Sequence, residues 1–273
     1  MGTTSHGIFV NSNNSIYLPH QLAGQILIWQ NENDLNPTKI ISGNLSNPTS
    51  LFVTTNGDIY VRSGDENRRV DKWIRGSETW ISVMNVQSQC SGLFIDIYDN
   101  LYCSMYDENR VDKKWLNGTT TIVAGTGRYG FSSDTFRSPR GIFVDINLDL
   151  YVADLENNRI QLFQLNQRNG ITVAEKGSAK VTIGLNAPTG VVLDGDQHLF
   201  IVDKGNHRII GSDENGFRCI FGCSGERGST DDKLSDPISM SFDSYGNIYV
   251  TDRTNHRVQK IVKNNICGKK NSI

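Results

Sequence analysis

The sequence lacks long apolar runs, an excess of charge and helical periodicity, and each absence excludes a class of protein. No apolar run approaches the ~18 residues that a membrane-spanning helix needs, so we expect no membrane insertion. The 273 residues carry a formal net charge of -2, which argues against nucleic acid as a partner because phosphate binding needs a basic field. No window shows sustained apolar residues at helical spacing, so helices should be nearly absent.

Cysteine is too scarce for a disulfide scaffold, although five cysteines exceed the need of a cytosolic chain. They are Cys90, Cys103, Cys219, Cys223 and Cys267. No CxxC pair or histidine cluster accompanies them, which argues against a zinc site. Cys219 and Cys223 could bridge only if the chain turns near Gly222, because an extended strand would hold them roughly 13 Å apart. The cysteines favour the oxidised state, and two bridges would leave one thiol over.

The sequence does contain one short motif that is repeated several times. Its last copies read LYVADLENNRIQ at 150–161, LFIVDKGNHRII at 199–210 and IYVTDRTNHRVQ at 248–259. An aromatic position recurs at Tyr17, Tyr60, Tyr102, Tyr151, Phe200 and Tyr249, at intervals of 43, 42, 49, 49 and 49 residues. A small residue opens each unit at the same intervals, near positions 7, 50, 92, 141, 190 and 239. Six such units indicate a repeat architecture.

Each unit predicts four short antiparallel strands. Segments such as GIFV, LYV and RIQLF are rich in β-branched and aromatic residues and are separated by Gly, Asn and Asp. A lone sheet of this size has two faces to bury, and radial stacking around a channel solves this problem. We therefore predict an all-β fold, a six-bladed β-propeller of four-stranded blades, as one domain over residues 1–273 and as a monomer.

The Asp and Arg that flank the repeated turn make the chain resemble the NHL repeat over essentially its whole length. Blades four to six carry the pattern. Blades two and three keep Asn67 with Arg68 and Asn109 with Arg110 but have Ser63 and Met105 in place of the aspartate, and blade one lacks the signature. FRCIFGCSG in blade five is most similar to cysteine-bearing NHL propellers of secreted and surface proteins. The resemblance implies an extracellular or cell-surface location.

The repeated charged residues are interpreted as structural staples of the turn. They are Asp154 with Arg159, Asp203 with Arg208, and Asp252 with Arg257. Each aspartate ends one strand and each arginine begins the next, so the guanidinium and the carboxylate can meet across the turn. The alternative is a ring of ligand-binding arginines, but function normally resides in sites added to a repeated unit.

The two mouths of the channel offer weaker candidates. Asp96, Asp145, Asp194 and Asp243 follow the inner strands and are weak metal-ligand candidates, although turn chemistry alone explains them. The opposite mouth holds His6, Thr49, Ser91, Arg140, Thr189 and Ile238. Similar propellers include a zinc-dependent lyase, but one histidine without a carboxylate is no catalytic zinc set. We therefore expect no catalytic residues, no cofactor and no enzyme activity.

Two loops between blades are the candidate partner-binding segments. The first, residues 125–139, offers Arg128, Tyr129, Phe131 and Arg137, and the second, residues 223–237, offers Arg227. Arginine and aromatic residues on loops are typical of interface hot spots. The alternative for Phe131 and Phe136 is that they tuck inward to seal the gap between blades.

The expected function is a non-catalytic platform for a protein partner, as part of a larger extracellular or surface protein, since the start MGTTSHGIFV lacks a signal-peptide pattern. Two alternatives remain: the substrate- or RNA-recognition propeller of an intracellular, multidomain protein of the ubiquitin-ligase type, and a propeller lyase or hydrolase with a channel metal. Turn residues are acidic on blades two to four and basic on blades five and six, which favours a dipolar protein partner. A short closing strand is expected near residues 265–267 or 2–5, so deleting residues 263–273 should lower the melting temperature.

Overall fold

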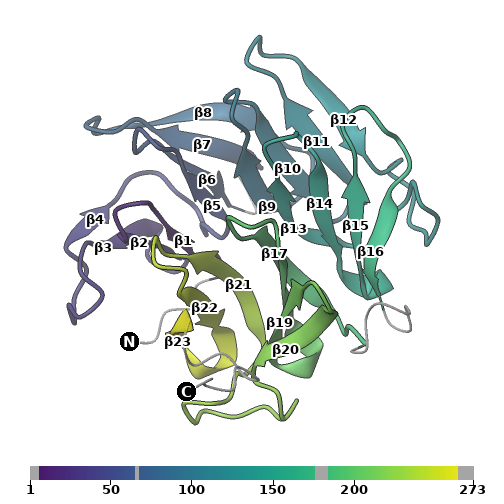
Figure 1. Cartoon of the computed structure of the whole chain (residues 1–273). Coiled ribbons are helices and arrows are strands. Elements are labelled where there is room, and N and C mark those ends of the chain that lie inside the picture. Colours follow the sequence, from purple (N-terminus) through teal and green to yellow (C-terminus); the bar gives the residue numbers. More distant parts are fainter. Residues whose placement is uncertain (1–5, 65–67, 176–183, 264–273) are drawn as a thin grey trace.

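The computed structural model describes residues 6–64, 68–175 and 184–263, and they form a six-bladed β-propeller around a central channel (Figure 1). The innermost strands are β1 (Phe9–Val10), β5 (Leu51–Val53), β9 (Cys90–Ile95), β13 (Pro139–Val144), β17 (Pro188–Leu193) and β21 (Pro237–Phe242). The second strands are β2 (Ile16–His20), β6 (Ile59–Ser63), β10 (Leu101–Met105), β14 (Leu150–Asp154), β18 (Leu199–Asp203) and β22 (Ile248–Asp252). The predicted fold is thereby confirmed.

The outer half of each blade completes an antiparallel sheet in chain order. The third strands are β3 (Gln25–Trp29), β7 (Arg69–Trp73), β11 (Arg110–Lys114), β15 (Arg159–Phe163), β19 (Arg208–Asp213) and β23 (Arg257–Ile261). The fourth strands are β4 (Lys39–Ile41), β8 (Trp80–Asn85), β12 (Thr120–Ala124), β16 (Ile171–Glu175) and β20 (Gly216–Phe221). Three one-turn 3-10 helices follow second strands, η1 (Leu155–Asn157), η2 (Lys204–Asn206) and η3 (Arg253–Asn255), and no helix in the described ranges is long enough to cross a membrane.

The hydrophobic core lies between blades, so neighbouring sheets bury each other's faces. Ile26 and Ile28 of blade one, for example, pack in one cluster with Ile59 and Val61 of blade two. Ile26, Ile59 and Val61 are fully buried. Burial of one such side chain contributes about 1.5–3 kcal/mol, and similar clusters recur around the ring.

The small residue that opens each repeat has a packing reason. A Cβ added to Gly141 on β13 would lie 2.6 Å from the carbonyl oxygen of Thr189 on the next inner strand. Six inner strands converge around one axis, and their backbones lie close to one another at this position. A small side chain at this position lets the ring close tightly.

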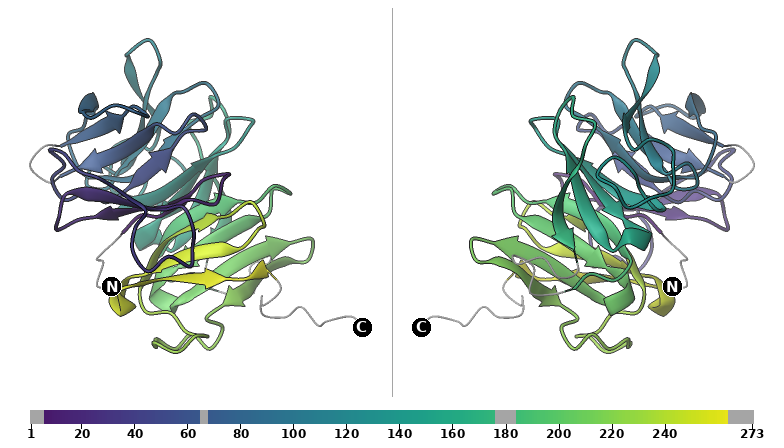
Figure 2. Two further views of the ribbon diagram at one scale, coloured as in Figure 1. Left: turned by 90° about the vertical axis from the view of Figure 1, so that its left-hand side faces the viewer. Right: turned by 90° about the vertical axis from the view of Figure 1, so that its right-hand side faces the viewer.

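Blades one and six meet side by side at the seam of the ring (Figure 2). The Val10 amide donates to Ser241 Oγ at 2.9 Å, and the Ser244 amide donates to Asn14 Oδ1 at 2.8 Å. Lys260 forms an ion pair with Glu32 at 2.5 Å. Within the described residues, blade six has three strands, and the closing strand predicted near residues 2–5 or 265–267 lies outside them.

Two disulfides join cysteines within single blades. Cys90–Cys103 links β9 to β10 across a Cα–Cα distance of 5.3 Å, and Cys219–Cys223 closes a turn after β20 at 5.6 Å. Gly222 supplies that turn with a φ of 70°, a left-handed conformation that glycine adopts without strain. The sequence had indicated a turn at this glycine; Cys267 lies outside the described residues.

Candidate functional site: the upper face and the channel mouth

The antiparallel order of strands gives the disc two different faces. The upper face carries the loops between blades and the turns between second and third strands, which include the repeated Asp and Arg. The lower face carries the turns between first and second strands and between third and fourth strands. The predicted loop residues, the staples and His6 with Arg140 thus share the upper face.

Each predicted staple forms a short ion pair across its turn. The Nε atoms of Arg159, Arg208 and Arg257 lie 2.7, 2.7 and 2.8 Å from the carboxylates of Asp154, Asp203 and Asp252, respectively. The three aspartates are fully buried. In each turn the carboxylate also accepts a hydrogen bond from an asparagine amide, namely that of Asn157, Asn206 or Asn255.

The staple arginines also fasten the loop that leads into their blade. Arg159 donates to the carbonyl oxygens of Phe131, Ser132 and Thr135 at 2.8 to 2.9 Å. Arg257 makes the same kind of contact with Ser229, Thr230 and Lys233. With their donors used in this way, these guanidiniums hold structure in place, which argues against the alternative of a ligand-binding arginine ring.

The left-handed residue of the turn is the one directly before the arginine. Asn158, His207 and His256 have φ values of 54°, 52° and 52°. By their hydrogen bonds, Asn157 of blade four corresponds to Asn206 of blade five. A histidine can stand at the left-handed position because only backbone geometry is demanded there.

Blades two and three replace the missing aspartate with another carboxylate. Arg69 and Arg110 pair with Asp71 and Asp112, two residues further along the same strand, at 2.8 and 2.9 Å. The sequence had matched the turn arginine of blade two to Arg68, but Arg69 pairs with Ser63 in the ladder and takes that place. The turn of blade two is one residue longer, which the repeat spacing conceals.

The loop between blades three and four presents two aromatic rings to solvent. Tyr129 is 59% exposed and Phe131 is 57% exposed. The Arg137 guanidinium lies 4.6 Å from the centre of the Tyr129 ring, and that of Arg159 lies 4.7 Å from the Phe131 ring. The Tyr129 hydroxyl donates to Glu156 at 2.9 Å. Both rings are therefore held by cations while one face of each stays accessible.

The remaining loop candidates differ in their surroundings. Phe136 is fully buried and packs on Phe163 at 5.4 Å, so it seals the gap between blades, whereas Phe131 does not tuck inward. Arg128 is exposed on the same loop. Arg227 lies on the loop before blade six and contacts Asp236 at 3.3 Å. The structure joins Tyr129 to Arg137 but places Arg227 on a separate part of the upper face.

The aspartates of the lower face close their own turns. Oδ1 of Asp96, Asp145, Asp194 and Asp243 accepts two backbone hydrogen bonds within each turn at 2.8 to 3.0 Å. Among the described residues they do not gather into one group; Asp194, Asp196 and His198 have ligand atoms within 4.8 Å of one another, but that group stays within a single turn. The arrangement favours turn chemistry over a metal.

A buried lysine behind one of these aspartates was not predicted from the sequence. Lys113 Nζ lies 3.1 Å from Asp96 and 2.6 Å from the Tyr102 hydroxyl, and its side chain is 2% exposed. Burial alone would raise the pKa of Asp96, but hydrogen bonds from Asn100 and Lys113 hold this pKa below its usual value. The repeated tyrosine and the repeated aspartate were recognised in the sequence. The lysine eleven positions after the tyrosine, which faces it on the next strand, was also visible but was not considered.

Exposed apolar residues on the lower face were also missed. Ile97, Tyr98, Ile146 and Tyr245 occupy its turns and are 61 to 72% exposed. They lie in the first-to-second-strand turns of blades three, four and six. They provide aromatic residues of comparable exposure on the face opposite Tyr129.

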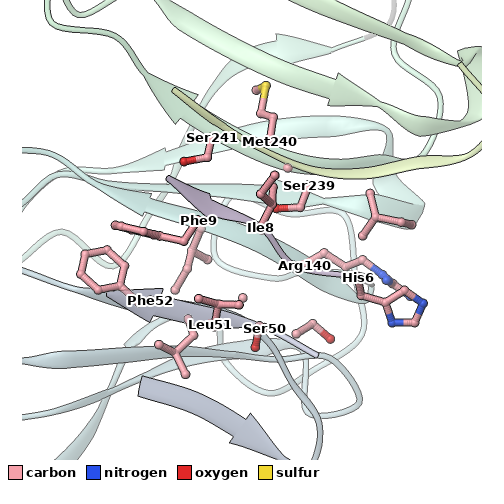
Figure 3. Close-up of a pocket in the computed structure, with 18 of the residues that line it drawn as sticks. His6, Ile8, Phe9, Ser50, Leu51, Phe52, Arg140, Ser239, Met240 and Ser241 are labelled. Atoms are coloured by element: carbon pink, nitrogen blue, oxygen red, sulfur yellow. The ribbon is translucent and has the colours of Figure 1, made fainter. Parts of the chain in front are cut away.

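The channel itself is a cavity of about 600 Å³ lined by inner strands of all six blades. At its upper end His6 and Arg140 lie beside one another, and Phe9 and Phe52 lie further along (Figure 3). The Gln21 amide donates to His6 Nδ1 at 2.8 Å. Burial, together with the positive charges of Arg253, Arg140, Arg62 and Lys204, lowers the pKa of His6 from 6.5 to about 4. At neutral pH the imidazole is therefore uncharged inside a ring of cations.

Comparison with known proteins agrees with the repeat pattern. The NHL repeat model matches residues 185–211 and 234–261, in blades five and six. No curated protein matches the sequence. Solved structures that share the fold include virginiamycin B lyase from Staphylococcus aureus, with 14% identity, a TM-score of 0.67, and coverage of 97% of this chain and 83% of that one.

Two proteins from Bacteroides thetaiotaomicron have the same fold. An auxiliary nutrient binding protein is 17% identical with a TM-score of 0.71, covering 96% of this chain and 69% of that one. A protein of unknown function is 13% identical with a TM-score of 0.74, covering 93% and 68%. At these identities the likeness establishes the architecture alone. The chain is a six-bladed β-propeller that carries NHL repeats in blades five and six.

Proposed function

We propose that this propeller is a non-catalytic platform that binds a protein partner through the loop between blades three and four. The observation that carries the proposal is the pair of exposed rings, Tyr129 and Phe131, each stacked on an arginine. Aromatic and arginine side chains dominate the binding energy of protein interfaces. A partner surface with apolar groups and carboxylates would complement these rings and the exposed Arg128.

The loop is fixed before any partner arrives. Arg159 holds its backbone at three carbonyl oxygens, Phe136 anchors it in the core, and the Asp154 carboxylate accepts the Arg137 amide at 2.7 Å. A segment that is already ordered loses little conformational entropy on binding. This supports recognition by a preformed surface rather than by an adaptable loop.

An extracellular or cell-surface location fits the same account. Disulfides form and persist in oxidising compartments, and this protein has two. The intracellular alternative, a recognition propeller of a ubiquitin ligase, has no comparable observation in its favour. A channel-metal enzyme would require ligands that the upper mouth does not bring together among the described residues.

The test is a quantitative capture experiment from the extracellular fluid of the natural source. The protein, a Tyr129→Ala/Phe131→Ala variant and a Tyr98→Ala/Tyr245→Ala variant are immobilised, and retained proteins are compared by mass spectrometry. The control removes two aromatic rings of similar exposure from the lower face. We expect a protein whose retention falls at least about tenfold with the loop variant and persists with the control. Equal retention by both variants would refute the proposal.

A further inference from the structure

The central channel has a different chemistry from the loop, and its two levels differ from each other. Four phenylalanines, Phe9, Phe52, Phe94 and Phe143, line one arc of its wall, with successive ring centres 4.9 to 5.0 Å apart. Val192 and Ser241 complete the circle at this level. The middle of the channel is therefore lined by an apolar crescent of phenylalanines, and the smaller side chains of Val192 and Ser241 leave more space on the remaining side.

The upper mouth, by contrast, gathers positive charge from several blades. Arg62 and Arg140 line the cavity, and Lys204 and Arg253 are near enough to act on His6. Arg140, Lys204 and Arg253 form no salt bridge with any described residue, whereas the staple arginines are all paired. Asp236 is the acidic group that acts on Lys204, and it also contacts Arg227.

Arg140 is the best candidate for a ligand-binding residue because of its position and its buried Nε. Its side chain reaches from β13 to the upper end of the cavity beside His6 (Figure 3). Its guanidinium lies 5.1 Å from the centre of the Tyr106 ring, and its Nε is buried without a hydrogen-bond partner among the described residues. A buried donor without a partner is costly, and an anion at the mouth would satisfy it.

We propose that the upper half of the channel binds a small amphipathic carboxylate, with its carboxylate at the mouth and its apolar body in the phenylalanine crescent. On the inner strand, Phe143 follows Arg140 by three residues, which corresponds to roughly 10 Å along the strand. A ligand of this class therefore needs its anionic and apolar ends about that far apart. The cavity of about 600 Å³ has the size of typical small-molecule sites.

The proposal is tested by calorimetric titration of 4-phenylbutanoate into the protein. The matched ligands are 4-phenylbutan-1-ol, which lacks the charge, and acetate, which lacks the apolar body. We expect phenylbutanoate to bind at least tenfold more tightly than either one. Equal affinity for the alcohol, or no binding of phenylbutanoate at millimolar concentration, would overturn the proposal, and this comparison requires no variant.

Variants at the channel mouth then locate the site. Arg140→Gln should weaken phenylbutanoate binding about tenfold or more, and Arg140→Lys should restore part of the loss. Arg168→Gln, an exposed arginine outside the channel lining, should leave the affinity unchanged. If Arg140→Gln fails to fold, Lys204→Gln takes its place. Unchanged binding by a folded mouth variant would contradict the assignment, and neither result depends on the loop between blades three and four.

Discussion

At the scale of single residues, the buried pair of Asp154 and Arg159 should contribute far more to stability than an exposed pair. The Asp154 side chain is fully buried and that of Arg159 is 3% exposed. Removing one partner leaves a buried charge, so Asp154→Ala should cost about 3–5 kcal/mol. Asp213→Ala breaks a partly exposed pair with Arg218 and should cost less than about 1 kcal/mol. Urea unfolding measures both, and equal losses would contradict the staple role.

The pKa of His6 predicts a pH dependence of stability. Because its pKa is about 4 in the folded protein and near 6.5 when unfolded, the unfolded state binds more protons between these values. The stability that neutral His6 contributes is present above about pH 6.5 and is lost as the pH falls towards 4. The difference in unfolding free energy between the wild type and His6→Asn should therefore decrease over this window. A constant difference would show that the pKa of His6 is not lowered in the folded protein.

The contacts of the staple arginines show why the sequence predicted their ion pairs but not their hydrogen bonds to the loops. The strand–turn–strand pattern was enough to pair Asp154 with Arg159, because both flank one turn. The carbonyl oxygens that Arg159 also binds belong to residues 24 to 28 positions earlier, and their place depends on the path of the loop. No local pattern encodes that path.

At the scale of elements, the close packing of the inner-strand backbones at Gly141 can be tested by substitution. A methyl group on Gly141 would collide with the carbonyl oxygen of Thr189, which is backbone and cannot rotate away. Gly141→Ala should therefore lower the melting temperature by several degrees, in line with overpacking costs of about 1–3 kcal/mol. The control is Gly195→Ala, because a methyl group there meets open space and the substitution should be neutral. Gly118 also has open space around it, but its φ of 90° would strain an alanine. Equal melting temperatures for Gly141→Ala and Gly195→Ala would refute the packing argument.

The repeat spacing predicted the elements well because the first half of every unit has a constant length. It predicted less where units differ, as in the longer turn that brings Arg69 into the place expected for Arg68. It also could not identify the mouth cations as a set. Lys204 and Arg253 occupy the same repeat position, which was a visible signal, but Arg62 and Arg140 come from other positions and meet them only when the ring closes.

At the scale of the whole molecule, the two disulfides predict the redox state of the natural protein. They engage four of the five cysteines, so alkylation and intact mass of non-reduced protein should show one free thiol. That result would support an oxidising compartment and a search among extracellular partners. Five free thiols would contradict the disulfides and favour the intracellular alternative.

The upper face combines three features that the closed ring brings together: fixed loops, exposed rings beside arginines, and a cationic channel mouth. The lower face instead has self-contained turns and scattered exposed apolar residues. The central claim is that partner recognition belongs to the upper face. It follows from the arrangement of six blades and from no single repeat.

Hydroxyl-radical footprinting tests this claim most directly, with the purified protein compared before and after incubation in extracellular fluid of its natural source. The account predicts that oxidation of Tyr129 and Phe131 decreases on incubation, while that of Tyr98 and Tyr245 does not change. Protection of Tyr98 and Tyr245 with Tyr129 and Phe131 still reactive would contradict it and place the binding surface on the lower face.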